Sequence, residues 1–239
     1  MQVELVESWG SDLTPVNAAR VSFANESDWE CSGYEDMNGD WHDVIGLSAK
    51  DTKLIHYLAK HKHTSCFEHQ GATLRLKVPI FIARQIQRHR TFSYNEISRR
   101  YVDNPPEFFW PEKWRAKADN VKQGSSMNKV VETMLRPVSD DHWPPQKVAD
   151  EFIKYVNDLY SDMLDANIAP ELARMILPQN MYTEFYMSGN LRAFSHFLQL
   201  RLDGHAQLEV QQAAQQVEAL LRPLWPVSMN ALMKETSNG

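Results

Sequence analysis

The sequence predicts an α+β fold, because segments with strand and helix periodicity follow one another without a strict strand–helix–strand order. Residues 2–5 and 73–78 alternate apolar and polar side chains, which is typical of half-buried strands. Residues 148–163 and 206–221 carry apolar side chains at helical spacing. A length of 239 residues suffices for one large core, so we expect a single domain over residues 1–239.

In the N-terminal part, the strand at residues 2–5 precedes a helix that Pro15 can begin, since proline fits the first turn of a helix. Residues 25–47 are polar, acidic and irregular, which predicts a long inserted loop. Ser48 followed by Asp51 resembles a capping box, so we expect the next helix to start there.

The central part begins with the strand at residues 73–78, and Pro79 is then expected to open a helix that runs to about His89. The chain after this helix is rich in serine and asparagine, which favours a turn-like stretch. Residues 103–146 are dense in proline and predict a second inserted loop, with one helix near residues 129–135.

The C-terminal part is expected to be mainly helical. Residues 148–163 form a long helix, and Pro170 begins a short one that stops before Pro178. The elements that follow are an aromatic-rich strand at residues 181–187 and helices at residues 191–203 and 206–221.

Composition narrows the class of protein. The formal net charge of −6 argues against a general nucleic-acid binder, which would usually be basic. No apolar run approaches the roughly 18 residues that span a bilayer, so no membrane partner is expected. The first ten residues lack the cationic start of a signal peptide, and two cysteines, Cys31 and Cys66, suit a reducing compartment. We therefore expect a cytoplasmic protein.

The charge is concentrated in one block, residues 84–101, which holds five arginines and a single acid, Glu96. A cationic block in an acidic protein predicts a specific anionic ligand. Neither a glycine-rich dinucleotide turn nor a P-loop motif is present, so side chains would have to bind a phosphate, and arginine has the most suitable geometry. The serine, histidine and tyrosine residues in the block distinguish it from a purely solvated basic surface.

The sequence also offers three other interpretations. The basic block is also compatible with a nucleic-acid or anionic-nucleotide binding module, in which Phe92, Tyr94 and Tyr101 would stack on bases.

Two segments could suggest a metal site. Residues 36–47 resemble the start of a calcium-binding loop, but the glycine and the last ligand position do not match that motif. A histidine-rich stretch at residues 61–69 matches no zinc spacing, so no metal is expected.

The basic block also resembles a known family. Residues 88–101 match the pattern RHRxxSxNExSxRY of the flavin-dependent thymidylate synthases at every fixed position. Further blocks similar to that family, in the same order, occur at residues 17–23, 63–69, 78–85, 173–178 and 205–211. The resemblance therefore covers most of the chain, and it implies a central, largely antiparallel sheet flanked by helices and a homotetrameric assembly.

The resemblance implies FAD as cofactor and assigns residues to it. His196 stands where relatives often have asparagine, although a histidine can also donate a hydrogen bond. Glu96 is expected to serve both the cofactor and the substrate. The cofactor-binding residues implied are His63, Ser65, Arg88, His89, Arg90, Glu96, Asn190, Arg192, His196 and His205.

The resemblance likewise implies that dUMP is the substrate and dTMP the product. Arg201 would be the catalytic residue, placed against the uracil to stabilise the ring ionised at N3. His205 would lie one helical turn beyond it. The substrate-binding residues implied are Gln85, Arg88, Glu96, Ser98, Arg99, Arg100, Arg174 and Arg201.

The implied co-substrates are NADPH, which reduces the flavin, and methylenetetrahydrofolate, which supplies the carbon. The family uses no cysteine nucleophile, and neither cysteine of this sequence stands beside an evident activating base.

Overall fold

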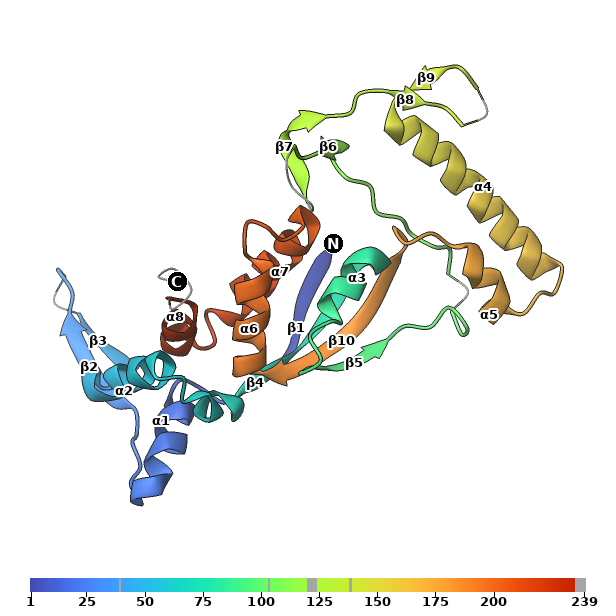
Figure 1. Cartoon of the computed structure of the whole chain (residues 1–239). Coiled ribbons are helices and arrows are strands. Elements are labelled where there is room, and N and C mark those ends of the chain that lie inside the picture. The colour runs from blue at the N-terminus through green and yellow to red at the C-terminus, as the bar shows by residue number, and fades with distance from the viewer. Residues whose placement is uncertain (39, 103, 120–123, 138, 235–239) are drawn as a thin grey trace.

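The computed structural model describes residues 1–38, 40–102, 104–119, 124–137 and 139–234 and has an α+β architecture (Figure 1). Its centre is a four-stranded antiparallel sheet with the strand order β1-β4-β10-β5. The predicted fold class and central antiparallel sheet are therefore confirmed. The strands are β1 (Gln2–Trp9), β4 (Gly71–Pro79), β10 (Tyr182–Asn190) and β5 (Ser93–Glu96).

Strands β4 and β10 form the middle of the sheet because the buried face of β4 is apolar throughout and that of β10 is apolar apart from Thr183. Leu74 and Leu76 of β4 lie opposite Met187 and Phe185 of β10, and all four side chains are buried. Apolar area removed from water in this way stabilises the fold by about 1.5–3 kcal/mol for each large side chain. The alternation at residues 73–78 thus predicted both the strand and its buried face.

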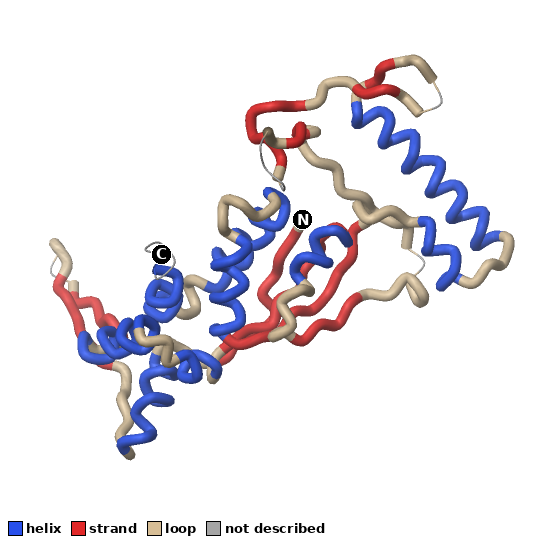
Figure 2. Tube along the Cα trace, in the orientation of Figure 1, coloured by secondary structure: helices blue, strands red, loops and turns tan. Residues whose placement is uncertain are grey.

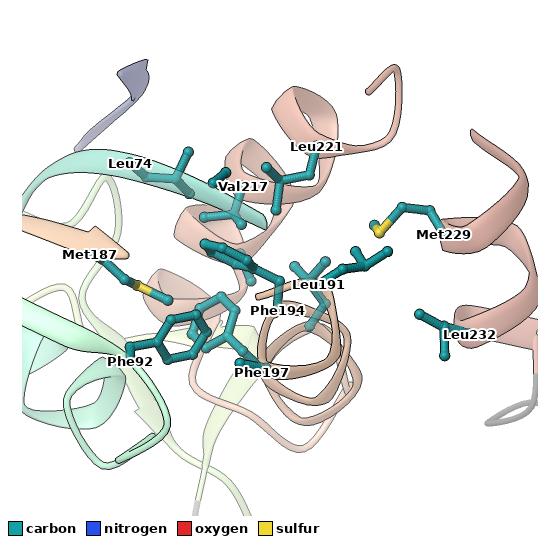
Figure 3. Close-up of a cluster of buried hydrophobic side chains, with 14 of the residues drawn as sticks. Leu74, Phe92, Met187, Leu191, Phe194, Phe197, Val217, Leu221, Met229 and Leu232 are labelled. Carbon is teal, nitrogen blue, oxygen red and sulfur yellow. The ribbon is translucent and has the colours of Figure 1, made fainter. Parts of the chain in front are cut away.

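Helices cover the apolar face of the sheet, as Figures 1 and 2 show. Figure 3 shows Phe194 and Phe197 of one helix packed among Leu74, Met187 and Val217. The helices on the sheet are α3 (Ile80–Ile86), α6 (Leu191–Arg201) and α7 (Leu208–Leu221), and α8 (Pro226–Lys234) packs farther out, against α6 and α2 (Ala49–Lys60).

Helix α8 has no counterpart among the elements predicted from the sequence. The buried carboxylate of Asp12 accepts hydrogen bonds from the backbone N–H groups of Val227 and Ser228, both at 2.8 Å. A carboxylate on the first N–H groups of a helix satisfies donors that have no partner within it. This cap joins residues 215 positions apart, so no local sequence pattern could reveal it.

The N-terminal helices pack beside this core. Helix α1 (Leu13–Arg20) starts two residues before Pro15, which therefore lies within its first turn. Ser48 caps α2 (Ala49–Lys60), since its hydroxyl accepts from the N–H of Asp51 at 3.0 Å, so the predicted helix start is confirmed. The short helices η1 (Val21–Phe23) and η2 (Thr64–Glu68) complete this part.

The expectation of a loop at residues 25–47 is wrong, because the segment contains a hairpin of β2 (Glu30–Glu35) and β3 (Trp41–Gly46). The turn is closed by Asp36, whose carboxylate accepts from the N–H groups of Asn38 and Asp40. Most side chains of β3 are exposed, so backbone pairing rather than burial holds the two strands. Without a buried face, the hairpin has no apolar alternation to predict it.

The helix expected near residues 129–135 is also wrong. That region holds β7 (Ser125–Val130), paired with β6 (Arg115–Lys117), and then β8 (Met134–Leu135), paired with β9 (His142–Trp143). The β-branched Val130 and Val131 favour extended backbone here. The helices that follow agree with the prediction: α4 (Pro145–Asp165), α5 (Pro170–Ala173) and η3 (Arg174–Ile176).

Three local corrections bear on the site. Helix α3 ends at Ile86 rather than His89, so Arg88 and His89 lie in the turn that follows it. The expected turn after the helix contains a strand, β5, because its backbone pairs with β10. Helix α6 ends at Arg201 and α7 begins at Leu208, so His205 lies in the connecting turn. Within the described residues, no helix is both long and apolar enough to cross a bilayer.

Candidate functional site

A cavity of about 760 Å³ lies where β5, the end of α3 and the α5–η3 segment meet. The residues after β5 run along its wall, because β5 pairs with β10 and the N–H of Ile97 donates to the carbonyl of Glu184. Four residues of the predicted substrate set line this cavity together with one further arginine of the basic block: Glu96, Ser98, Arg99, Arg174 and Arg84.

Glu96 is fixed in the cavity by two hydrogen bonds. Its Oε1 accepts from the hydroxyl of Thr183 at 2.6 Å, and its Oε2 accepts from the side-chain amide of Gln87 at 3.1 Å. A carboxylate has about four acceptor positions, so each oxygen can still receive a ligand hydroxyl or N–H. The sequence did not indicate Thr183, because only the pairing of β10 with β5 brings it to Glu96.

The cationic side chains around the cavity differ in whether they have a hydrogen-bond or ion-pair partner in the protein. Lys77 pairs with Glu107 at 2.7 Å, and Arg99 donates to the backbone carbonyl of Asn104. Arg84 and Arg174, in contrast, are exposed and have no partner among the described residues. Two free guanidinium groups beside a fixed carboxylate suit a ligand that combines a phosphate with hydroxyl groups.

Arg100, also predicted to bind the substrate, does not line the cavity. Its Nε lies 3.4 Å from a carboxylate oxygen of Glu171, and its guanidinium lies over the ring of Tyr101 at 5.4 Å from the ring centre. Half of the Arg100 side chain is exposed, so this ion pair is readily exchanged for another anion.

A second group of predicted residues meets where α3 and the turn after it approach the end of α6. The Nε of Arg201 donates to the Nε2 of His89 at 3.0 Å, and an Nη of Arg201 donates to the carbonyl of Gln85 at 3.0 Å. His196, one and a half turns earlier on α6, places its ring 6.0 Å from that of His89. The side chain of Gln85 donates to Gln207 at 2.6 Å.

The electrostatics of this second group follow from burial. The pKa of His89 is lowered to about 4, first by burial and then by the nearby Arg201 and His196. Burial also lowers the pKa of Arg201 below its usual value, although it stays a cation at neutral pH. His89 is only 7% exposed, whereas its neighbours Arg88 and Arg90 are exposed. The three residues therefore alternate between solvent and core.

A third group lies at the other end of β10. Asn190 caps α6, since its side-chain oxygen accepts from the N–H of Ala193 at 2.9 Å, and its amide group is left for a ligand. Arg192 forms an ion pair with Glu68 of η2. His63 and Ser65, at the start of η2, are exposed. Arg192 and His196 are one turn apart, so they share the exposed face of α6.

His205 stands apart from these groups. Its side chain is fully exposed, and its Nδ1 lies 2.9 Å from the carboxylate of Asp203. The turn between α6 and α7 thus directs it to solvent instead of continuing the helix from Arg201.

Within one chain, the three groups of predicted site residues do not form one continuous site. Thr183 and Asn190 are seven residues apart on β10, which at about 3.3 Å per residue is roughly 23 Å. Along α6, Arg192 and Arg201 are roughly 14 Å apart at about 1.5 Å per residue. One mononucleotide cannot touch all three groups in one chain. A longer ligand or residues from another chain would have to connect them.

The described residues do not form a metal centre. Among the described residues, no three His, Cys, Asp or Glu side chains are placed to hold an ion. Gly39 of the calcium-like pattern lies outside the described residues, and the Asp36 carboxylate beside it accepts from backbone N–H groups. Burial raises the pKa of the Cys66 thiol, which makes it a poor nucleophile.

Comparison with known proteins gives consistent matches over nearly the whole chain. Residues 4–227 match the family described as "Thymidylate synthase complementing protein". A protein of Thermotoga neapolitana named "Flavin-dependent thymidylate synthase" is 36% identical over 240 residues, 99% of this chain and 93% of that protein. A protein of the same name from Thermus thermophilus is 35% identical, over 99% of this chain and 77% of its own length.

A solved structure agrees in fold and in sequence. The UMP/dUMP methylase PolB from Streptomyces cacaoi, crystallised with 5-Br dUMP, superposes with a TM-score of 0.71 and is 31% identical. The match covers 98% of this chain and 94% of that one.

Proposed function

Because this chain belongs to the flavin-dependent thymidylate synthase family, we propose that it is a methyltransferase that converts dUMP to dTMP with FAD as cofactor. The observation that carries the proposal is the cavity in which two unpartnered arginines face a hydrogen-bonded glutamate. That combination suits a nucleotide monophosphate with a sugar hydroxyl, and the relative PolB is a methylase of UMP and dUMP.

The substrate half of the proposal assigns the 760 Å³ cavity to dUMP. Arg174 and Arg84 bind the phosphate, and Arg99 joins them by exchanging the carbonyl of Asn104 for it. Ser98 and Arg100 flank Arg99 in the chain. Glu96 accepts a hydrogen bond from the sugar, since both of its oxygens are already oriented by protein donors. This arrangement is supported by the residues that line the cavity.

The cofactor half assigns the outer surface of α6 and η2 to FAD. His63, Ser65, Asn190, Arg192 and His196 are the residues proposed to hold it there. Arg88 and Arg90, exposed on either side of a buried histidine, are free to contact a phosphate or a flavin carbonyl. The capping amide of Asn190 and the guanidinium of Arg192 offer donors to such a ligand.

The chemistry requires an ionised pyrimidine. Arg201 stabilises the form of the uracil ring that is ionised at N3, because a fixed guanidinium lowers the free energy of a nearby anion. FAD, when bound, supplies the hydride after reduction by NADPH, and methylenetetrahydrofolate supplies the carbon. Cys66 takes no part as a nucleophile, since its thiol is held protonated.

A homotetramer completes the site in this proposal. It is supported by the separation of roughly 23 Å along β10, which a second copy of the chain could bridge. Large apolar side chains also remain exposed outside the core, among them Phe152 and Tyr155 of α4 at 55% and 67%. Exposed apolar surface of this kind is typical of an interface. Light scattering on the purified protein measures the assembly directly.

The test of the function begins with an absorbance spectrum of the purified protein, followed by titration with dUMP. A bound oxidised flavin whose bands change on dUMP addition is expected, together with dTMP formation from NADPH and methylenetetrahydrofolate. A colourless protein that takes up no added FAD would contradict the proposal. Binding that falls steeply with salt and shows no preference for a mononucleotide would instead favour the nucleic-acid interpretation.

A further inference from the structure

We propose that His89 is a positioning residue that fixes the orientation of Arg201 through a neutral imidazole, rather than primarily a ligand of the cofactor. The inference rests on the proposed function, in which Arg201 faces the uracil. It assigns to the middle residue of the Arg88–Arg90 triplet a role different from that of its two neighbours.

The hydrogen bond between the two side chains determines the protonation state of His89. An arginine side chain carries only donors, so the Nε2 of His89 must be the acceptor in the 3.0 Å contact with the Nε of Arg201. A protonated imidazole has no acceptor. The ring is therefore neutral, with its proton on Nδ1.

The fold holds the His89 ring independently of any ligand. The ring meets Phe197 of α6 edge-on, with 5.0 Å between ring centres, and is 7% exposed. The backbone carbonyl of His89 lies 3.0 Å from the hydroxyl of Tyr94, which also contacts the carbonyl of Ile86. A side chain fixed at both ring and backbone is suited to orient another group, but offers little surface to a cofactor.

The contacts also determine where Arg201 points. Two of its five N–H groups are used, one by His89 and one by the carbonyl of Gln85. These two bonds fix the plane of the guanidinium, because it is rigid and flat. The three remaining N–H groups have no partner among the residues described and are available to a substrate. Loss of His89 would leave one bond, about which the plane can swing.

The surroundings keep the ring neutral over the working range of pH. The titratable groups that face it are Arg201 and His196, both on α6, and neither is an acid. From β5, Tyr94 meets only the backbone of His89. No carboxylate contacts the ring in the part of the chain described, so a proton would gain no counter-charge there.

Two polar substitutions separate positioning from packing. In His89→Gln, the side-chain amide reaches the place of Nε2, so an oxygen can still accept from Arg201. In His89→Asn, the shorter amide reaches only the place of Nδ1, and the acceptor is lost. We expect His89→Gln to keep kcat within ~3-fold and His89→Asn to lower it by ~100-fold, as misplacement of a catalytic group does.

The readout must exclude a purely structural effect. Both variants should bind FAD at the wild-type stoichiometry, and KM for dUMP should change less than kcat. The double variant His89→Asn with Arg201→Lys should lose no more than Arg201→Lys alone, because the two residues act as one unit. Equal losses in His89→Gln and His89→Asn, loss of FAD in His89→Asn, or additive losses in the double variant would each overturn the inference.

A measurement independent of turnover separates this inference from the proposed function. Magic-angle-spinning ¹⁵N spectra of histidine-labelled protein, with His89→Asn as the assignment control, should show one neutral ring with its proton on Nδ1 at pH 6. A protonated ring, or a proton on Nε2, would refute the role of His89. Absence of dTMP formation with the expected tautomer present would refute only the proposed function.

Discussion

The arginines of the 760 Å³ cavity and Arg201 illustrate two ways in which a protein presents the same side chain. Arg84 and Arg174 are exposed and unpartnered among the described residues, so they can follow a flexible anion. Arg201 is half-buried and held by His89 and Gln85. The first arrangement suits binding of a phosphate, whereas the second suits stabilisation of charge at one defined position.

Exposure and the number of bonds to the protein separate a binding arginine from a catalytic one more sharply than residue type does. A free surface arginine loses side-chain entropy when it binds a ligand, which reduces its net contribution. A preorganised guanidinium has lost that freedom during folding and meets the transition state without rearrangement.

Replacement of the held arginine should have the largest effect. Arg201→Ala is expected to lower dTMP formation by ~10³-fold or more, because a preorganised donor to a developing anion is removed. FAD should remain bound, since the exposed residues of α6 and η2 are unchanged. The measurements are turnover and flavin absorbance of the same sample. Near-normal turnover would refute the assignment of Arg201.

Replacement of a free arginine should act on binding instead. Arg174→Ala is expected to raise KM for dUMP by ~30-fold with a smaller change in kcat, because a charge-assisted hydrogen bond contributes about 1.5–3 kcal/mol. Arg222→Ala is the matched control, since that arginine pairs with Glu218 on α7, away from the cavity. A fall in kcat at unchanged KM would mean that Arg174 acts in catalysis rather than in substrate binding.

The buried histidine should make the folded state sensitive to acid. His89 has a pKa lowered to about 4 in the folded protein, against its usual 6.5, so the unfolded chain binds the proton first. Its contribution to stability is therefore fully present above about pH 6.5 and is lost as the pH falls towards about 4. Between pH 8 and pH 5 this amounts to roughly 2 kcal/mol.

The measurement is the free energy of unfolding of the wild type and of His89→Gln in denaturant at both pH values. Because glutamine does not titrate, the variant should lose about 2 kcal/mol less stability on acidification. The same loss in both proteins would mean that His89 is not held neutral by the fold.

The smallest effect is expected for a residue that acts through Glu96. Thr183→Val keeps the shape of the side chain but removes the 2.6 Å hydrogen bond to the Glu96 carboxylate. Turnover at low dUMP should fall by ~5–10-fold, in line with about 1 kcal/mol for one hydrogen bond. Thr73→Val on β4, whose hydroxyl meets Ser188 at 2.8 Å, is the control in the same sheet. Equal effects in both variants would indicate a general change in the sheet.

The sheet core and the hairpin β2–β3 differ in how far the sequence predicted them. Strand β4 buries one complete face, so Leu74, Leu76 and Val78 alternate with polar residues and reveal the strand. The hairpin buries little, and its acidic composition suggested a loop. A strand or helix can be predicted from local sequence only where one of its faces is buried, because burial produces a periodic pattern of apolar residues.

For the site, the sequence indicated which residue types would gather but not how they would meet. The basic block was evident from its arginines and its resemblance to a family, and four of the residues predicted to bind the substrate line one cavity: Glu96, Ser98, Arg99 and Arg174. The partners Thr183 and Glu171 were not indicated, because they come from distant elements. Asn190 and His205 were assigned only to the cofactor, although one caps a helix and the other lies in an exposed turn.

The fold class, the strands and helices with a buried face, and the family of the chain could all be inferred from the amino-acid sequence. Each of these depends on local periodicity or on a contiguous motif. Only helix packing places His89 inward against Arg201 while Arg88 and Arg90 face solvent. The pairing of β10 with β5 likewise places Thr183 against Glu96. These contacts join residues about 90 to 110 positions apart, and they form only when strand pairing and helix packing bring distant segments together.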